Sequence, residues 1–468
     1  MHPHHNQPTA IVIFGGTGDL ARTKLLPALY DLFIARALPD TYTILGLSRK
    51  PLHDADYQEF VADSIRQSKP LVKITDIQNF CRRFRYISGS FDETETYEQI
   101  KTALTDFDRS INLCTNKLFY LAVPPEYYAN IFFHLATSDA MRLCDDGVSW
   151  SRLLVEKPFG KDLKTAQALE RQLCSLFTDE QIYRIDHYLA KDAIENIISL
   201  RFANSILTDS WNKERIESIA IKLLETKDVA NRGSFYDGIG ALRDVGQNHM
   251  LQILALLTMP AVDVHDATAV RTARAQTLAD LLATRPHTII RGQYSDYRTT
   301  TGVHPASETE TYFRIELKSE AKAWQGVAIT LEAGKALSRA TNEAVITFKA
   351  IDTCYCAHDT KPHTHHNTLT ISFSPIQRIA LAMWVKKPGL TFTLEERELE
   401  LIHTRSTDTY SPEAYERVLY DCIIGDQTRF VSGTEVEVAW QFITPILEQF
   451  ATLPLHAYEK GSQGPHRE

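Results

Sequence analysis

The octapeptide RIDHYLAK, residues 184–191, brings five ionisable or hydrogen-bonding side chains together. In a helix of about 3.6 residues per turn, His187 and Lys191 would share one face, and Tyr188 would lie close to it. Asp186 would point elsewhere. Such a face could hold an anion while the carboxylate serves another purpose. The alternative is a solvated helix start with an acidic first turn.

A second chemical candidate is the stretch FYDGIGALRDVGQNHMLQILALL, which carries Asp244 and His249 at the head of an apolar run. This pattern predicts a core helix whose first turn faces a cleft. In an α-helix, residues five apart differ in direction by roughly 140°. Both side chains can therefore face one ligand only if Asp244 lies in or before the opening turn. A lone histidine here could equally be a satisfied core residue.

The stretch IVIFGGTGDLA predicts a nucleotide site, because a buried strand leads directly into a glycine-rich turn and a helix. Gly16, Gly18 and Ala21 fit the pattern G-x-G-x-x-G/A, and Gly15 adds backbone freedom. Glycine lets the backbone approach a pyrophosphate, and the helix start supplies unpaired N–H groups and partial positive charge.

The end of the next strand, GLSRK, bears on which dinucleotide binds. NAD sites usually place an acid there, which accepts a hydrogen bond from the ribose 2′-hydroxyl. This sequence has Arg49 and Lys50 instead, which favours the 2′-phosphate of NADP without excluding NAD. The alternative is a surface basic pair in a loop.

These sites require two kinds of architecture. The first third alternates strands and helices (AIVIFGG, LLPALYDLFIARAL, YTILGLSR, KLFYLAVPP, SRLLVEKPFG), which predicts an α/β Rossmann-like domain with a parallel sheet. Beyond about residue 190, half-exposed strands such as RIESIAIKLLE and QGVAITLEAG predict an α+β domain with a large, mainly antiparallel sheet. A chain of 468 residues fits two or three domains.

The bulk composition excludes several functional classes. The 50 basic and 59 acidic residues give a net charge of −9, which argues against non-specific nucleic-acid binding. No run approaches the roughly 18 apolar residues of a membrane span. The N-terminus lacks an apolar secretory segment, and seven scattered cysteines suit a reducing compartment. We therefore expect a cytoplasmic protein without nucleic-acid or membrane partners.

Eight motifs, in this order, resemble the glucose-6-phosphate dehydrogenase family: GGTGDLARTKL, LFYLAVPP, VEKPFG, RIDHYLAK, ALRDVGQNHMLQ, IIRGQY, GKAL and AYERVLYDCIIGDQT. They extend over nearly the whole chain. The resemblance implies an NADP-dependent oxidation of glucose 6-phosphate at C1 to 6-phosphogluconolactone, the first step of the oxidative pentose phosphate pathway, with NAD as a secondary acceptor. It also implies a nucleotide-binding domain at residues 1–186, a substrate-binding and oligomerisation domain at residues 187–468, and a homodimer or homotetramer.

The resemblance also implies residue roles. His249 would be the catalytic base, and Asp186 would orient its imidazole. The implied substrate-binding residues are Lys157, His187, Tyr188, Lys191, Glu225, Asp244, Lys335 and Arg339. The implied cofactor-binding residues are Gly15, Gly16, Thr17, Gly18, Asp19, Leu20, Arg49, Tyr120 and Lys157. A proline turn such as Pro124–Pro125 is a candidate for a cis bond, and the reaction needs no metal.

Three positions depart from the family pattern. Ala190 replaces the usual glycine of RIDHYLGK. Ala340 stands where a second Lys or Arg is common, so either neighbouring Arg339 takes over or the substrate phosphate is held less tightly. Gly246 replaces a larger apolar residue, and we expect it to loosen the first turn of the catalytic helix.

A cluster of cysteines and histidines at residues 354–366 invites a zinc interpretation. Its spacing fits no standard zinc finger, so we favour a variable hairpin tip. The competing functions are another sugar-phosphate or free-sugar dehydrogenase on the same scaffold, and a non-catalytic relative that binds ligands and regulates a partner.

Overall fold

A computed structural model describes residues 7–142, 148–351, 365–402 and 410–465. The chain forms two compact units. Unit 1 comprises Met1–Ala190, His265–Arg271 and Ser406–Gly433, and unit 2 comprises Lys191–Val264, Thr272–Arg405 and Thr434–Glu468.

Unit 1 is built on a seven-stranded sheet with the order β15-β6-β5-β4-β1-β2-β3. The described strands pair in parallel, except that β15 runs antiparallel to β6. This confirms the predicted α/β architecture. The strands are β1 (Thr9–Phe14), β2 (Tyr42–Ser48), β3 (Phe84–Ser88), β4 (Asn116–Leu121), β5 (Ser151–Glu156), β6 (Ile182–Ile185) and β15 (Phe430–Val431).

Continuous apolar runs explain the centre of this sheet. Every residue of β1, β2 and β4 is buried, as expected for strands covered by helices on both faces. The helices are η1 (Ala21–Leu25), α1 (Leu26–Ile34), α2 (Asp54–Ser68), α3 (Ile74–Cys81), α4 (Thr94–Ile111), η2 (Pro125–Tyr127), α5 (Tyr128–Thr137), α6 (Leu163–Leu176), η3 (Asp179–Gln181) and α12 (Ala414–Ile424).

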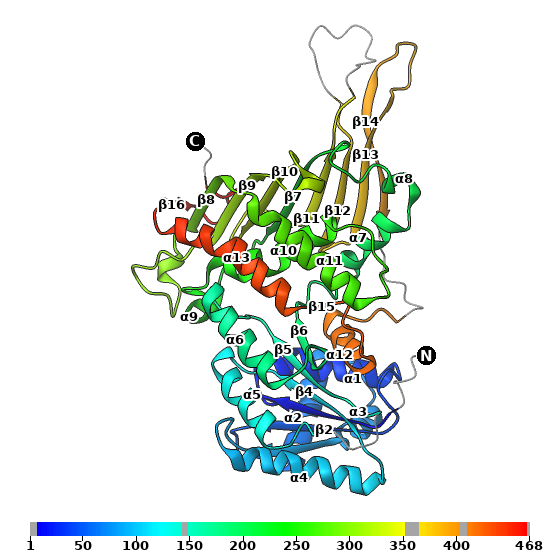
Figure 1. Ribbon diagram of the computed structural model, residues 1–468, viewed down its shortest axis with the longest axis vertical. Coiled ribbons are helices and arrows are strands. Elements are labelled where there is room, and N and C mark those ends of the chain that lie inside the picture. Colours follow the sequence, from blue (N-terminus) through cyan, green and yellow to red (C-terminus); the bar gives the residue numbers. More distant parts are fainter. Residues whose placement is uncertain (1–6, 143–147, 352–364, 403–409, 466–468) are drawn as a thin grey trace. The chain divides into compact units, whose positions relative to one another are not determined.

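Unit 2 contains a nine-stranded sheet with the order β14-β13-β12-β11-β7-β10-β9-β8-β16 (Figure 1). Its pairs are antiparallel except β7 with β10 and β8 with β16, so the predicted mainly antiparallel sheet is confirmed. The strands are β7 (Ile216–Leu224), β8 (Pro286–Tyr294), β9 (Tyr312–Lys318), β10 (Ala328–Gly334), β11 (Thr341–Phe348), β12 (Thr368–Ser374), β13 (Arg378–Lys386), β14 (Leu394–Ile402) and β16 (Leu455–Tyr458).

Helices of unit 2 pack on this sheet: η5 contacts β7 and β10, and α7 contacts β12. A buried ion pair, Arg274 Nε to Glu435 Oε1 at 2.8 Å, ties α11 to α13. The helices are α7 (Asp192–Phe202), α8 (Ser205–Thr208), η4 (Ala230–Arg232), α9 (Gly233–Tyr236), η5 (Leu242–Met250), α10 (Leu251–Thr258), α11 (Ala267–Asp280, whose first residues belong to unit 1), η6 (Leu281–Ala283), η7 (Tyr297–Thr299), η8 (Lys322–Trp324) and α13 (Gly433–Phe450).

Three local expectations are wrong. RIDHYLAK is the end of β6 followed by a turn, because α7 begins only at Asp192. The cis proline bonds of the described residues are Lys157–Pro158 and Ser374–Pro375, so Pro124–Pro125 is trans. Cys114 is disulfide-bonded, although the cysteine pattern favoured reduced thiols.

Two further predictions concern membrane spans and the Cys/His cluster at residues 354–366. Among the described residues, no helix is both long enough and apolar enough to cross a bilayer. Cys354, Cys356, His358 and His363 of the predicted hairpin tip lie outside the described residues. His366 of the same cluster is described, and its Nδ1 lies 3.0 Å from Glu217 Oε2.

Candidate active site

The glycine-rich turn of unit 1 packs its backbone tightly against neighbouring strands. Gly15 has φ of +80°, and a Cβ there would lie 2.4 Å from the carbonyl oxygen of Ala122. The N–H groups of Gly15 and Gly16 donate to the Leu47 carbonyl of β2 at 2.9 and 3.0 Å. The N–H of Gly18 donates back to the Gly15 carbonyl at 2.8 Å. Only glycine fits at position 15, so the turn is the close-approach loop that the motif predicts.

A cluster of hydroxyl groups closes the end of β2, where NAD-dependent enzymes usually have an acid. Ser48 Oγ lies 2.9 Å from Thr17 Oγ1 of the glycine-rich turn and 2.7 Å from the Tyr86 hydroxyl. The guanidinium carbon of Arg49 lies 5.8 Å from the centre of the Tyr127 ring. The strand end therefore presents hydroxyl groups and a cation.

Glu156 at the end of β5 is a functional candidate that the sequence reading missed. It accepts a hydrogen bond of 2.5 Å from the predicted cofactor residue Tyr120, which is itself fully buried. Burial raises the pKa of Glu156 to about 7, while hydrogen bonds from Tyr120 and Tyr415 and the charge of Lys157 oppose the shift. The motif VEKPFG placed Lys157 correctly beside β5, but nothing in it signals that the preceding carboxyl is buried.

The turn after β6 organises the predicted phosphate-binding residues of unit 1. Asp186 is 2% exposed, and its Oδ1 accepts the Tyr188 N–H at 2.9 Å. Its backbone carbonyl accepts the Leu189 N–H at 3.0 Å. A short side chain that bonds backbone two residues ahead favours a turn over a helix. His187 stacks 6.4 Å from the Tyr415 ring, so α12 borders this turn.

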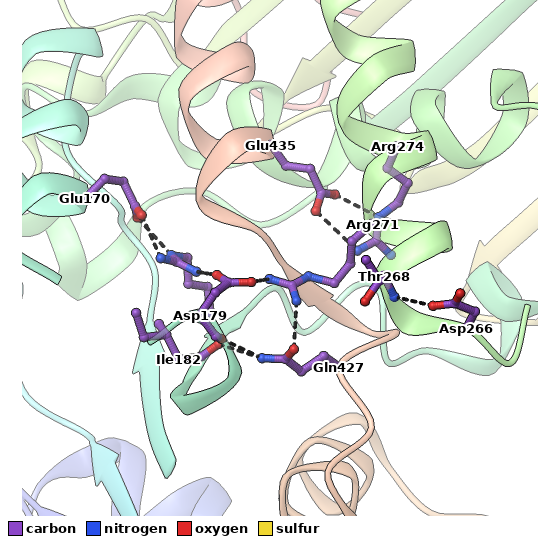
Figure 2. Close-up of polar contacts among 10 residues, drawn as sticks. Glu170, Asp179, Ile182, Asp266, Thr268, Arg271, Arg274, Gln427 and Glu435 are labelled. Carbon is purple, nitrogen blue, oxygen red and sulfur yellow. Dashed lines mark hydrogen bonds and ion pairs between the residues drawn. The ribbon is translucent and has the colours of Figure 1, made fainter. Parts of the chain in front are cut away.

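An ionic network in unit 1 anchors β6 just before that turn. Arg184 is fully buried, and its Nε and Nη2 donate to the two carboxylate oxygens of Glu170 at 2.8 and 2.6 Å. Asp179 lies between Arg184 and Arg271, with N–O distances of 3.5 and 2.9 Å. Figure 2 shows how these side chains converge from α6, η3 and the start of α11. Two cations are thus matched by two carboxylates, which burial requires.

Gln427 completes this network by joining a distant segment of unit 1 to it. Its Oε1 accepts a hydrogen bond of 2.8 Å from Arg271 (Figure 2). Its Nε2 donates to the backbone carbonyls of Asp179 and Ile182 at 2.9 and 3.1 Å. The start of β6 is therefore fixed by side chains from three separate chain segments.

In unit 2 the predicted catalytic helix begins as the π-helix η5, followed directly by α10. Its hydrogen bonds link residues five apart, which places Asp244 and His249 on nearly the same side. The separation of roughly 140° expected for an α-helix is therefore wrong for this segment. Gly246 does not simply loosen the turn. A Cβ there would lie 2.7 Å from Leu242 and 3.0 Å from Phe313, so glycine lets η5 approach β9.

Two parallel strands bring the substrate-binding candidates of unit 2 together. Leu224, the last residue of β7, pairs with Gly334, the last residue of β10. Glu225 and Lys335 follow these strand ends and so lie at one edge of the sheet. Lys335 Nζ is 3.0 Å from Glu225 Oε2 and 3.8 Å from an oxygen of Asp244.

Not all of the predicted substrate-binding residues of unit 2 belong to the cluster of Glu225, Asp244 and Lys335. Lys335 Nζ lies 5.4 Å from the centre of the Tyr236 ring, a buried neighbour that the sequence did not suggest. Lys191 precedes the first residue of α7 and is partly exposed. Arg339 is exposed and forms no hydrogen bond or ion pair with other described residues. Unit 2 thus brings Glu225, Asp244 and Lys335 together, but not Arg339.

A parallel sheet with a glycine-rich first turn, accompanied by a second unit that gathers carboxylates, a lysine and a histidine, defines a pyridine nucleotide-dependent dehydrogenase. The family model for "Glucose-6-phosphate dehydrogenase, NAD binding domain" matches residues 12–196. The family model for "Glucose-6-phosphate dehydrogenase, C-terminal domain" matches residues 198–468. The chain belongs to the glucose-6-phosphate dehydrogenase family.

Individual relatives agree along the whole length. The chain is 34% identical to glucose-6-phosphate 1-dehydrogenase of Chlamydia muridarum (strain MoPn / Nigg), over 95% of this chain and 91% of that protein. It is 35% identical to the enzyme of Cyberlindnera jadinii, over 97% of this chain and 92% of that protein. A solved structure of glucose-6-phosphate dehydrogenase in complex with its substrate superposes with a TM-score of 0.89 at 32% identity. The superposition covers 99% of this chain and 97% of that one.

Proposed function

We propose that this protein oxidises glucose 6-phosphate at C1 to 6-phosphogluconolactone and transfers the hydride to NADP, as a glucose-6-phosphate 1-dehydrogenase. The reaction breaks the C1–H bond with its electron pair and removes the proton of the C1 hydroxyl. Membership of the family and the similarity to a substrate complex support the substrate.

His249 is assigned as the base that takes the hydroxyl proton as the hydride leaves C1. A positioned base of this kind typically contributes about 10²–10⁴-fold to the rate. His249 is 1% exposed, so few water molecules can reach its imidazole and compete with the sugar hydroxyl. Asp186 is assigned the role of orienting the imidazole and stabilising the cation that forms.

The remaining residues are assigned either to the sugar hydroxyls or to the 6-phosphate end of the substrate. Glu225 and Asp244 would accept hydrogen bonds from sugar hydroxyls, and such carboxylates reject analogues that leave them unpaired. Lys335 bridges the two carboxylates and holds them together. The residues proposed to hold the 6-phosphate or border the sugar are Lys157, His187, Tyr188, Lys191 and Arg339.

NADP supplies the hydride acceptor when bound, and the residues of unit 1 fit it. The glycine at position 15 lets the turn lie close against the Ala122 carbonyl, and the adjoining helix start supplies N–H groups for a pyrophosphate. The end of β2 has no acid to favour the ribose 2′-hydroxyl of NAD, whereas Arg49 and Thr17 suit a phosphate. The roles of residues 1–186 in nucleotide binding and 187–468 in substrate binding follow from this assignment.

The observation that carries the proposal is the geometry of η5. A π-turn sets Asp244 and His249 on one side of the helix, and Lys335 contacts both Asp244 and Glu225 beside the adjacent strand ends. A base, two hydroxyl-binding carboxylates and a cation are the groups that oxidation of a phosphorylated hemiacetal requires.

The test is absorbance at 340 nm with purified protein, glucose 6-phosphate and either NADP or NAD. The same assay on His249→Asn is the matched control, because asparagine keeps a polar side chain but cannot act as the base. We expect rapid NADPH formation that falls by about 10²–10⁴-fold in the variant, with NAD as the poorer acceptor.

Other outcomes separate the competing functions. Turnover of free glucose, or of another sugar phosphate, without turnover of glucose 6-phosphate would overturn the substrate assignment and implicate Ala340. Cofactor binding without oxidation of any sugar would favour a regulatory, non-catalytic role.

We also propose that the protein forms a homodimer or homotetramer through the β13–β14 end of its large sheet. β14 is an edge strand, and its Leu399, Leu401 and Ile402 are 63%, 60% and 50% exposed. Met383 and Val385 of β13 are also exposed. A long edge strand that exposes several apolar side chains can pair with a second copy. Light scattering after size-exclusion chromatography would give the mass, and Leu401→Lys should yield monomers. A cytoplasmic location stays a prediction, consistent with a relative from Arabidopsis thaliana named as cytoplasmic.

A further inference from the structure

The helix that carries Asp244 and His249 begins without a capping side chain of its own. Its N-cap residue is Ala241, which has no side-chain acceptor to offer. The first N–H groups of a helix lack partners within the helix and need acceptors from elsewhere. Glu310, far away in sequence, supplies them. Its Oε1 accepts the Leu242 N–H at 3.0 Å, and its backbone carbonyl accepts the Ala241 N–H at 3.1 Å.

The chain around Glu310 is held rigidly. Asp237 accepts hydrogen bonds from the Thr309 hydroxyl at 2.9 Å and from the His304 N–H at 3.0 Å. The Thr309 hydroxyl in turn accepts the Gly238 N–H at 2.8 Å. Because Thr309 immediately precedes Glu310, these bonds fix where the Glu310 side chain starts.

The segment that leads into the helix is also shaped around this carboxylate. Gly240 has φ of +76°, and a Cβ there would lie 2.3 Å from Glu310 Oε1. Glycine is therefore needed both for the backbone conformation and for the close approach. Glu310 is 4% exposed, so neither the helix start nor the carboxyl group can move without the other.

Positive charges from two neighbouring elements act on Glu310. Arg243 comes from η5 and Arg291 from β8, and both favour its ionised form. Tyr236 from α9 feels both Glu310 and Asp244, and burial followed by these two charges raises the pKa of its hydroxyl. Burial raises the pKa of Glu310 to about 7, while the Leu242 N–H and the two arginines oppose the shift. The group is therefore costly to keep ionised.

A cavity of about 300 Å³ adjoins this group. Glu310, Arg243, Arg291 and Glu308 line the cavity. Glu308 is 68% exposed and lies 3.4 Å from Arg291, so it belongs to the rim. The same loop thus holds one buried carboxylate at the helix and one exposed carboxylate two residues away.

We propose that Glu310 is the positioning residue of η5: its carboxylate fixes the start of the helix and thereby positions Asp244, which faces Lys335, and His249. The inference deepens the proposed function and rests on it for its kinetic consequence. A helix that starts loosely would shift the sugar-binding carboxylate and the base together, since both lie within its first eight residues.

The kinetic test compares Glu310→Ala, which removes the cap, with Glu310→Gln, which keeps an acceptor oxygen but no charge. For Glu310→Ala we expect the KM for glucose 6-phosphate to rise about tenfold and kcat to fall about tenfold, together the roughly 100-fold loss in kcat/KM that misplaced catalytic groups can cause. Glu310→Gln should change both about threefold. The KM for NADP should stay within about twofold. Glu308→Gln, the matched control, should behave as wild type.

This pattern distinguishes positioning from a purely structural role. Loss of folded protein would lower the apparent kcat alone and leave both KM values unchanged. That result, or an equal rise of the two KM values, would overturn the proposal. If Glu310→Ala does not fold, the same comparison is made with Glu310→Gln.

Hydrogen exchange of the ligand-free protein tests the cap without any substrate. Amides of residues 241–247 should exchange at least tenfold faster in Glu310→Ala than in wild type or Glu308→Gln. Unchanged protection would contradict the inference even if the enzyme is active. Faster exchange in a protein that does not oxidise glucose 6-phosphate would uphold the cap and reject only the proposed function.

Discussion

The glycine-rich turn of unit 1 and the π-helix η5 of unit 2 build their sites in different ways. The turn is assembled from residues 15–18 and their immediate contacts on β2 and β4. The helix start depends on Glu310, and its functional neighbours Glu225 and Lys335 lie on other strands. A local site is sensitive to the backbone, whereas an assembled site is sensitive to the side chains that brace it.

The largest expected effect is on the local site. Gly15→Ala must place a Cβ 2.4 Å from the Ala122 carbonyl oxygen at a φ of +80°. The strained conformation costs on the order of 1–3 kcal/mol, and the collision adds to it, so we expect about 3 kcal/mol or more in total. Urea unfolding measures the stability, and calorimetric titration measures NADP affinity, which should fall at least tenfold.

Gly461→Ala is the matched control for this substitution. Gly461 also has a positive φ, +74°, but a Cβ there would meet nothing within 4 Å. It should lose only the conformational component, about 1 kcal/mol, without an effect on NADP binding. Equal losses in the two variants would show that close packing at Gly15 is unimportant.

In the assembled site, Lys335→Ala should raise the KM for glucose 6-phosphate about 100-fold. Its removal leaves Glu225 and Asp244 without their shared cation, and truncating one partner of a partly buried charge cluster costs about 2–5 kcal/mol. Initial rates at saturating NADP measure the effect, and the KM for NADP should not change.

Arg339→Ala sharpens the same comparison. The Arg339 guanidinium is exposed and forms no hydrogen bond or ion pair with the described residues, so its loss should raise the KM only about threefold. A larger effect at Arg339 than at Lys335 would mean that Arg339 compensates for Ala340 as the main phosphate ligand.

The sequence predicted what local patterns determine. The strands of unit 1, the glycine-rich turn and the apolar helix after Asp244 follow from buried runs, glycine spacing and periodicity. The position of Glu225 beside Lys335 did not follow from spacing, since it depends on the parallel pairing of β7 with β10. The family resemblance predicts that both residues bind substrate, and the strand register explains why they lie together.

The errors share a physical cause. The spacing of RIDHYLAK is compatible with a helical face. In the structure, however, the Asp186 side chain accepts the Tyr188 N–H, and the strand ends in a turn. The predicted angle between the Asp244 and His249 side chains applies to an α-helix. This segment is a π-helix, in which the two side chains point in more similar directions. Glu156, Glu310 and the network around Arg184 were missed because burial, which gives these charges their importance, is a property of the folded chain.

A last prediction concerns the pH dependence of stability, where the two units are alike. The pKa of Glu156 rises from an ordinary 4.5 to about 7 because the group is buried. Between these values the folded chain keeps a proton that the unfolded chain has released, so this group's contribution to stability falls as the pH rises. The loss should be roughly 2 kcal/mol between pH 5 and pH 8.

Glu156→Gln should remove this loss, because the amide stays neutral and its oxygen can still accept from Tyr120. The variant should therefore gain on wild type as the pH rises, a gain read from urea unfolding at pH 5 and pH 8. Glu98→Gln, at a position whose side chain is 55% exposed, is the control and should show no such gain. Gains at pH 8 no larger than those at pH 5 would mean that the tyrosine hydroxyls stabilise the carboxylate enough to offset its burial. In that case unit 1 would tolerate its buried charge better than unit 2 tolerates Glu310, and only the latter would remain a source of pH sensitivity near neutrality.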